Sequence, residues 1–100
     1  MTFTNNFGKG ITCTIITKDV CDDEGYIESF EWHPKKPPMR GKLLKDYKVW
    51  FNWVNKQIAD HYECVIVHVY HTDDGFEAYI FAPGQESKPA TLDELKQIIQ

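Results

Sequence analysis

The stretch LLKDYKVWFNWVNKQIADH, residues 43–61, decides the fold because it is the clearest helical segment of the chain. At about 100° per residue, its apolar side chains fall within one arc of about 120°. The residues of this arc are Leu43, Leu44, Tyr47, Trp50, Phe51, Val54 and Ile58. The segment therefore predicts a long amphipathic helix whose apolar arc faces the core.

The residues before this helix predict a β-hairpin. Residues 11–16 and 26–33 alternate in residue types that favour strands, and residues 22–25, Asp-Asp-Glu-Gly, supply turn chemistry between them. Residues 1–10 are expected to form an N-terminal arm or a short extra strand. Residues 34–42 are expected to form a basic loop, because their three prolines cannot continue a ladder or enter a helix interior.

The residues after the long helix predict two more strands and a second helix. Residues 62–72 and 76–82 are rich in strand-favouring types, and the Thr-Asp-Asp-Gly-Phe sequence at 72–76 is typical of a type I turn followed by glycine. Thr91 and Glu94 match a capping box, in which the two residues satisfy free amides at a helix start. The order ββαββα predicts a four-stranded, mainly antiparallel sheet with both helices packed on one face.

Length and composition set the broad class. One hundred residues, 42% hydrophobic and 26% charged, can bury one core, so we expect a single α+β domain over residues 1–100. The net charge of −4 is too small to indicate whole-surface binding to nucleic acid. No apolar run approaches the roughly 20 residues of a membrane span, and the first residues lack a signal-peptide pattern. The expected location is therefore the cytoplasm, with the three cysteines reduced.

One group of residues has the types that bind zinc, namely His61, Cys64, His68 and His71. On an extended strand residues 64 and 68 lie about 13 Å apart, and residues 68 and 71 point to opposite faces. One ion cannot reach this set without a bulge or a second segment, so we predict no metal site. The chain also contains no glycine-rich nucleotide-binding motif, so no cofactor is expected.

His71 and Glu77 are the leading catalytic candidates, with His33 as a third. The predicted turn places His71 opposite Glu77, and a histidine held by a carboxylate can act as a general base. An ordinary cross-strand pair is the simpler interpretation, because no nucleophile or oxyanion donor is identifiable nearby. The favoured interpretation is therefore that the protein is not an enzyme. The alternative is a small hydrolase-like enzyme whose site contains His71 and Glu77.

The outer side of the long helix and the basic loop carry the candidate partner-binding residues. Val49 and Trp53 are four residues apart and lie outside the apolar arc. The tryptophan could anchor a partner protein, or stack on a nucleobase while lysines meet phosphate. The alternative is that the loop or the N-terminal segment folds over it. The full candidate set is Trp53, Val49, Lys45, Lys56, Lys35, Lys36, Arg40 and Lys42.

The third and fourth strands are apolar on both sides, as Val65, Val67 and Val69 alternate with Ile66 and Tyr70. Two helices on one face leave the other face of the sheet uncovered. This pattern predicts a homodimer through the sheet face, unless residues 1–10 cover it.

The leading hypothesis is a small interaction or regulatory module that binds another macromolecule through its sheet face, outer helix face or basic loop. A protein partner or a second copy of the chain is favoured. A protein that binds RNA or single-stranded nucleic acid through Trp53 and the loop lysines is a further alternative.

Overall fold

The chain forms two compact units, each with its own three-stranded antiparallel sheet. The structure is a computed structural model that describes residues 1–21, 24–72 and 75–99. Unit 1 is Met1–Val54 and unit 2 is Asn55–Gln100. The boundary falls within the long helix α1 (Gly41–Tyr62), so each unit contains part of this helix.

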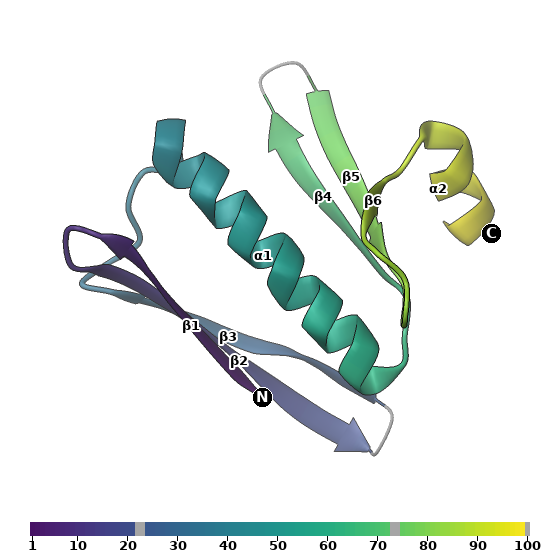
Figure 1. Cartoon of the computed structure of the whole chain (residues 1–100), viewed down its shortest axis with the longest axis horizontal. Helices are drawn as coiled ribbons and strands as arrows, with labels where there is room; N and C mark the ends of the chain where they lie inside the picture. The colour runs from purple at the N-terminus through teal and green to yellow at the C-terminus, as the bar shows by residue number, and fades with distance from the viewer. Residues whose placement is uncertain (22–23, 73–74, 100) are drawn as a thin grey trace. The chain divides into compact units, whose positions relative to one another are not determined.

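Unit 1 contains strands β1 (Thr2–Gly8), β2 (Ile11–Cys21) and β3 (Glu24–His33), in the order β1-β2-β3. Figure 1 shows α1 running along this sheet. The central strand β2 buries Cys13, Ile15 and Thr17, which alternate along one face. Ile15 lies between Phe3 of β1 and Phe30 of β3, so the apolar residues of all three strands share that inner face.

Aromatic rings fill the space between this sheet and the first part of α1. The Phe7 ring lies 5.7 Å from Trp32 and 5.6 Å from Trp50, and Tyr47 lies 5.4 Å from Phe51, all between centroids. Such pairs contribute about 0.5–1.5 kcal/mol each beyond the area that they bury. A layer of mostly half-buried aromatic rings therefore joins this sheet to α1, next to the buried side chains of Cys13, Ile15, Phe51 and Val54.

The prediction of a helix over residues 43–61 is confirmed, with ends one or two residues further out. Of the predicted arc, Phe51, Val54 and Ile58 are buried. The helix ends where Glu63 takes a φ of +50° and the Cys64 amide donates to the Ala59 carbonyl at 3.1 Å. This is the hydrogen bond of a Schellman cap, formed here with a non-glycine residue in the left-handed conformation.

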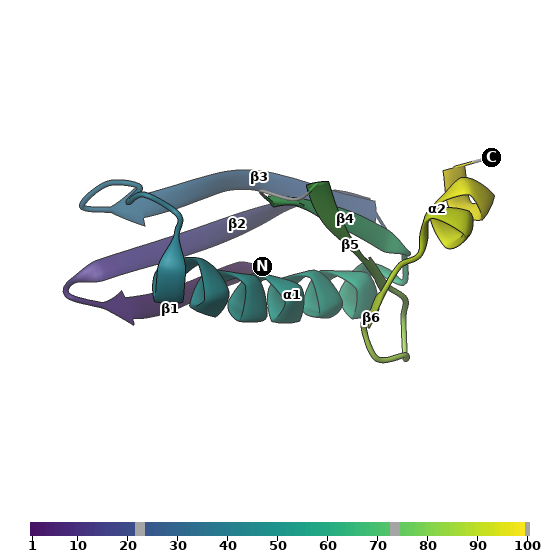
Figure 2. The same cartoon turned by 90° about the horizontal axis from the view of Figure 1, so that it is seen from above.

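Unit 2 contains strands β4 (Ile66–Thr72), β5 (Gly75–Phe81) and β6 (Lys88–Pro89), in the order β4-β5-β6, followed by helix α2 (Leu92–Ile99). Figure 2 shows β6 leading into α2 near the C-terminus. The buried residues of this unit include Ile58, Ala59, Tyr62, Tyr70, Ala78, Ile80 and Phe81.

The end of α1 holds the loop after β5 through polar contacts. Lys56 donates to the Asp60 carboxylate at 2.6 Å and to the Ala82 carbonyl at 3.4 Å. Asp60 also accepts from the Gly84 amide at 2.9 Å. These hydrogen bonds, with Lys56 as the largest cause, hold the pKa of Asp60 below its usual value.

The expected four-stranded sheet with two helices on one face is wrong, although the α+β class is confirmed. Residues 2–8 form the third strand of one sheet and residues 88–89 form the third strand of the other. Each hairpin therefore gains its extra strand from its own unit. The strand expected at 62–72 begins only at Ile66, because α1 continues through Tyr62.

The start of the second helix is confirmed. The Glu94 amide donates to the Thr91 hydroxyl at 3.2 Å, as a capping box requires. Lys88 lies 3.4 Å from the Glu94 carboxylate and donates to it, which is the largest cause of the lowered pKa of Glu94.

The structure does not test the predictions for the two turn tips or for the number of domains. Asp22, Asp23, Asp73 and Asp74, at the tips of the two predicted turns, lie outside the described residues. The expectation of a single domain over residues 1–100 remains a prediction, because the contacts of the chain divide it into two compact units. Among the described residues, no helix is long and apolar enough to cross a membrane.

Candidate functional site

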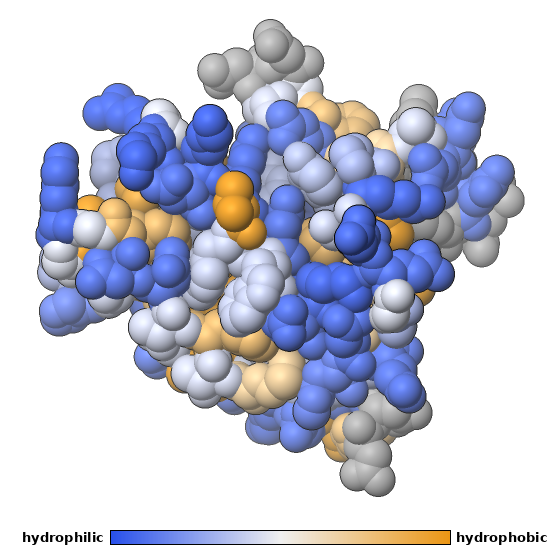
Figure 3. Space-filling model, viewed as in Figure 1, coloured by the Kyte–Doolittle hydropathy of each residue, from blue (hydrophilic) through white to orange (hydrophobic). Residues whose placement is uncertain are grey.

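The outer face of α1 exposes an apolar surface, which we call the outer helix patch and define by Phe3, Lys45, Val49 and Trp53. Val49 is 69% exposed and Trp53 is 52% exposed. The edge of Phe3, from β1, meets the Trp53 ring at a centroid distance of 5.7 Å. Figure 3 shows hydrophobic and near-neutral side chains gathered over the middle of α1 within a mostly hydrophilic surface. The N-terminal strand thus contacts Trp53 but leaves half of it open.

The three lysines predicted to lie near Trp53 differ in their exposure to solvent and in their ion pairs. Lys45 is exposed one turn before Val49. Lys42 is exposed but pairs with Asp46 at 3.0 Å, one turn further along the helix. Lys56 is mostly buried and is held by Asp60 and the Ala82 carbonyl. Lys56 is therefore a structural residue of unit 2 rather than a free cation beside Trp53.

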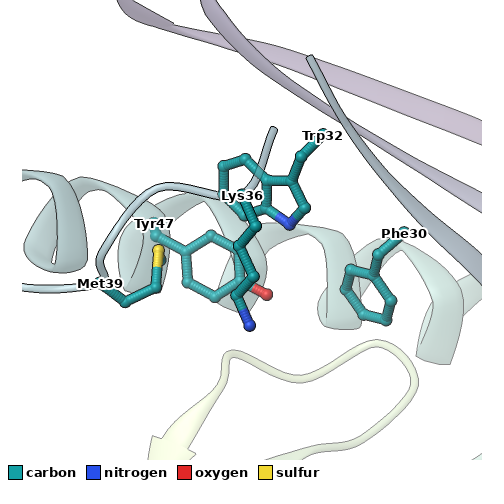
Figure 4. Close-up of a pocket in the computed structure, with 5 residues that line it drawn as sticks. All are labelled: Phe30, Trp32, Lys36, Met39 and Tyr47. Carbon is teal, nitrogen blue, oxygen red and sulfur yellow. The ribbon is translucent and has the colours of Figure 1, made fainter. Parts of the chain in front are cut away.

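A pocket of about 350 Å³ opens where β3, the basic loop and α1 meet. We call it the aromatic pocket and define it by Phe30, Trp32, Lys36, Met39 and Tyr47. Figure 4 shows the other four side chains arranged around Tyr47. Three rings and a thioether line the pocket, and Lys36 brings a positive charge to it. The combination is typical of a small-molecule site, in which apolar walls carry a few polar groups.

Burial changes the acid–base properties of two groups in and behind this pocket. It raises the pKa of the Tyr47 phenol to about 12, so Tyr47 is a neutral hydrogen-bond donor at pH 7. It also raises the pKa of the Cys13 thiol to about 11, while the positive charge of Lys36 acts weakly in the opposite direction. Neither group is therefore an activated nucleophile or base.

The outer helix patch and the aromatic pocket lie on different sides of α1. Tyr47 and Trp53 are six positions apart, which places them about 120° apart around the helix axis. Phe3 of β1 reaches Trp53, whereas Phe30 and Trp32 of β3 line the pocket with Lys36. The structure therefore does not bring Trp53 and Lys36 together on one surface. Lys35 and Arg40 are exposed in the same loop as Lys36.

The predicted pairing of His71 with Glu77 is wrong. His71 lies opposite Phe76, and Glu77 lies opposite Tyr70. Thr72 pairs with Gly75, so two residues separate the strands rather than the expected three, and a one-residue shift moves side chains to the other face. His71 and Glu77 consequently project from opposite faces of the hairpin.

The other catalytic and metal candidates are also dispersed. His33 lies in β3 of unit 1, opposite Thr12. His61 ends α1, Cys64 follows it, and His68 and His71 lie in β4. In the parts of the chain that the structure describes, no three His, Cys, Asp or Glu side chains converge in a way that could hold a metal ion.

Unit 2 exposes apolar residues on its sheet. Val69 and Phe76 are both exposed, and the pairing places Val69, His71, Phe76 and Ala78 on one face. Residues 1–10, the alternative cover for the sheet face, contain Phe3 and Phe7, which pack against Trp53 and Trp50 within unit 1.

The aromatic pocket is the feature that sequence reasoning missed. The sequence places Tyr47 in the apolar arc of the helix, and the alternation of residues 26–33 places Phe30 and Trp32 on one face of a strand. Their alternation was the available signal for a shared face. Met39 and Lys36 also line the pocket, and their positions depend on the path of the proline-rich loop. The sequence of this loop has no periodic pattern from which its path could be predicted.

Comparisons with protein families, curated proteins and solved structures found no match to this chain. Its function is therefore argued from its own surfaces.

Proposed function

We propose that the protein is a small non-enzymatic interaction module that binds a partner protein through the outer helix patch. The observation that carries the proposal is the exposure of Trp53, 52%, next to Val49, 69%. The other two tryptophans, Trp32 and Trp50, each pack against Phe7 in the aromatic layer of unit 1. Tryptophan is enriched among the residues that contribute most to protein–protein binding, where its truncation costs about 2 kcal/mol or more.

The geometry favours a protein partner over a nucleic acid. A single-stranded nucleic acid needs cations along its backbone beside the ring on which its bases stack. Lys36 lies with Tyr47 on another side of α1, Lys56 is held within unit 2, and Lys42 pairs with Asp46. Lys45 is the lysine of the outer helix patch itself, and a single exposed cation suits the rim of a protein interface.

The geometry also favours a binding role over catalysis. His71 and Glu77 point to opposite faces, so they do not form a base and its orienting carboxylate. The raised pKa values of Cys13 and Tyr47 leave both groups protonated at pH 7. We place the interaction in the cytoplasm, where the three free cysteines would stay reduced.

Site-specific photo-cross-linking in the cells that make the protein tests the proposal. A photoreactive benzoylphenylalanine replaces Val49, which is exposed in the outer helix patch. The matched control carries it at Glu31, an exposed residue of β3 that pairs with Thr14 on the outer face of the sheet. We expect a discrete protein adduct from position 49 and none of the same mass from position 31. The same adducts from both positions, or an adduct with RNA from position 49, would contradict the proposal.

A further inference from the structure

We infer that the aromatic pocket is a second, separate site, which binds a small molecule that combines a flat apolar ring with an anionic group. The inference does not depend on the outer helix patch, because the two surfaces lie on different sides of α1. It assigns a ligand chemistry to residues that the proposed function leaves unused.

The walls of the pocket select a flat apolar group. Phe30 and Trp32 come from one face of β3, Tyr47 from α1 and Met39 from the loop between them. Rings attract other rings in offset or edge-to-face arrangements, and a thioether packs favourably against aromatic groups. A volume of about 350 Å³ is at the small end of the range for ligand pockets, which favours a ligand of one or two rings.

The charge around the pocket selects an anion. Lys36 lines the pocket, and residues 34–42 contain four basic residues and no acidic one. The nearest acid of β3, Glu31, pairs with Thr14, whereas Trp32 pairs with Cys13 on the inner face, so Glu31 points away. Aromatic pockets without such a charge can bind cations, but Lys36 repels them.

Polar groups of the pocket can bind the anion directly. The Lys36 ammonium supplies the charge, and the Tyr47 hydroxyl remains a neutral donor at pH 7 because burial raises its pKa to about 12. A hydrogen bond between an ammonium and a carboxylate is roughly twice as strong as one between neutral groups. We therefore expect the negative charge of a ligand to contribute measurably to its affinity.

Titration of ¹⁵N-labelled protein with 2-naphthoate and with 2-naphthamide tests the inference. The two probes have the same rings and nearly the same shape, but only 2-naphthoate is charged. The chain has three tryptophans, so the indole N–H signals of Trp32, Trp50 and Trp53 report on separate places. We expect 2-naphthoate to shift the Trp32 signal saturably while the Trp53 signal stays in place, and 2-naphthamide to bind about tenfold more weakly.

Two variants locate the charge that the ligand meets. Lys36→Met keeps the apolar stem and removes the ammonium, and should weaken 2-naphthoate binding about tenfold without affecting 2-naphthamide. Lys45→Met makes the same change in the outer helix patch and should leave both affinities within about twofold. Equal wild-type affinities for the two probes, a 2-naphthoate shift centred on Trp53, or no saturable shift of Trp32 would each overturn the inference. The comparison of the two probes uses only wild-type protein, so it holds even if Lys36→Met fails to fold.

Discussion

The three tryptophans show how position within an element sets the role of a residue. Trp50 and Trp53 are three positions apart on α1, yet Trp50 packs against Phe7 and Tyr47 while half of Trp53 is exposed. The helical spacing predicted this difference, because Trp50 falls within the apolar arc and Trp53 falls outside it. The spacing could not predict that Phe3 would reach Trp53, since this contact requires residues 2–8 to pair with β2.

The Cys13 thiol should make the stability of the protein depend on pH in the alkaline range. Its side chain is fully buried, and burial raises its pKa from 9.0 to about 11. The folded state thus favours the protonated thiol, so this stabilisation is present below about pH 9 and is lost as the pH rises toward 11. Between about pH 8.5 and pH 10.5, wild type should lose roughly 1 to 2 kcal/mol more unfolding free energy than Cys13→Ala.

Urea unfolding of both proteins at the two pH values measures this difference. Cys13→Ala serves as the reference because it lacks the thiol. Burial, the largest cause of the raised pKa of Tyr47, acts in both proteins, whereas the smaller effect of the Cys13 charge acts only in wild type. Parallel losses of stability in wild type and Cys13→Ala would show that the thiol ionises alike in the folded and unfolded states.

The elements differ in how much of their structure the sequence determines. Helix α1 and the Thr91 cap were predicted closely, because both depend on residues within four positions of one another. The predicted register between β4 and β5 is wrong by one residue, because the register depends on whether the turn contains two residues or three. This shift of one residue removes the predicted catalytic pair, because it places His71 and Glu77 on opposite faces of the hairpin.

Two truncations on α1 should separate its binding face from its core face. Phe51 is buried, meets the Phe30 ring edge-on and lies tilted against the Tyr47 ring, so Phe51→Ala should cost about 3–5 kcal/mol of unfolding free energy. Trp53→Ala removes a larger side chain but leaves no buried cavity, so it should cost only about 0.5–1.5 kcal/mol, the value of its contact with Phe3.

Chemical denaturation of the two variants measures both costs under identical conditions. The two changes lie in the same helix and both create alanine, so helix propensity contributes similarly. If Trp53→Ala cost as much as Phe51→Ala, Trp53 would be a core residue and the outer helix patch would lose its anchor.

At the scale of the whole molecule, the class of fold was predictable and the number of sheets was not. The pattern of strands and helices identified an α+β protein, but it could not show that the two hairpins would remain in separate sheets. Strand partners are chosen by long-range contacts, and residues 1–10 and 88–89 carry only weak strand signals. The sequence therefore predicted either an arm or a short strand for residues 1–10, and it did not predict the strand at residues 88–89.

We expect the protein to form a homodimer through the sheet of unit 2. Val69 and Phe76 are exposed on one face of this sheet, where Ala78 and Ile80 are buried, and exposed apolar side chains on a sheet favour association. Light scattering at micromolar concentration should give about twice the chain mass of 11.7 kDa. Val69→Lys should give monomers, whereas Val49→Lys, an equivalent change on α1, should leave the dimer intact. A wild-type mass of 11.7 kDa throughout the concentration range would remove this expectation.

The central claim is that Trp53 serves binding rather than folding, and cross-linking from position 49 in a Trp53→Ala background tests it most directly. The measured quantity is the yield of the position-49 adduct relative to the protein that retains Trp53. The account predicts that the yield falls at least about tenfold, since losing a tryptophan anchor costs about 2 kcal/mol or more. The unfolding free energy should meanwhile fall by no more than about 1.5 kcal/mol, so that the chain stays folded. An unchanged yield of the same adduct from the folded variant would contradict the account.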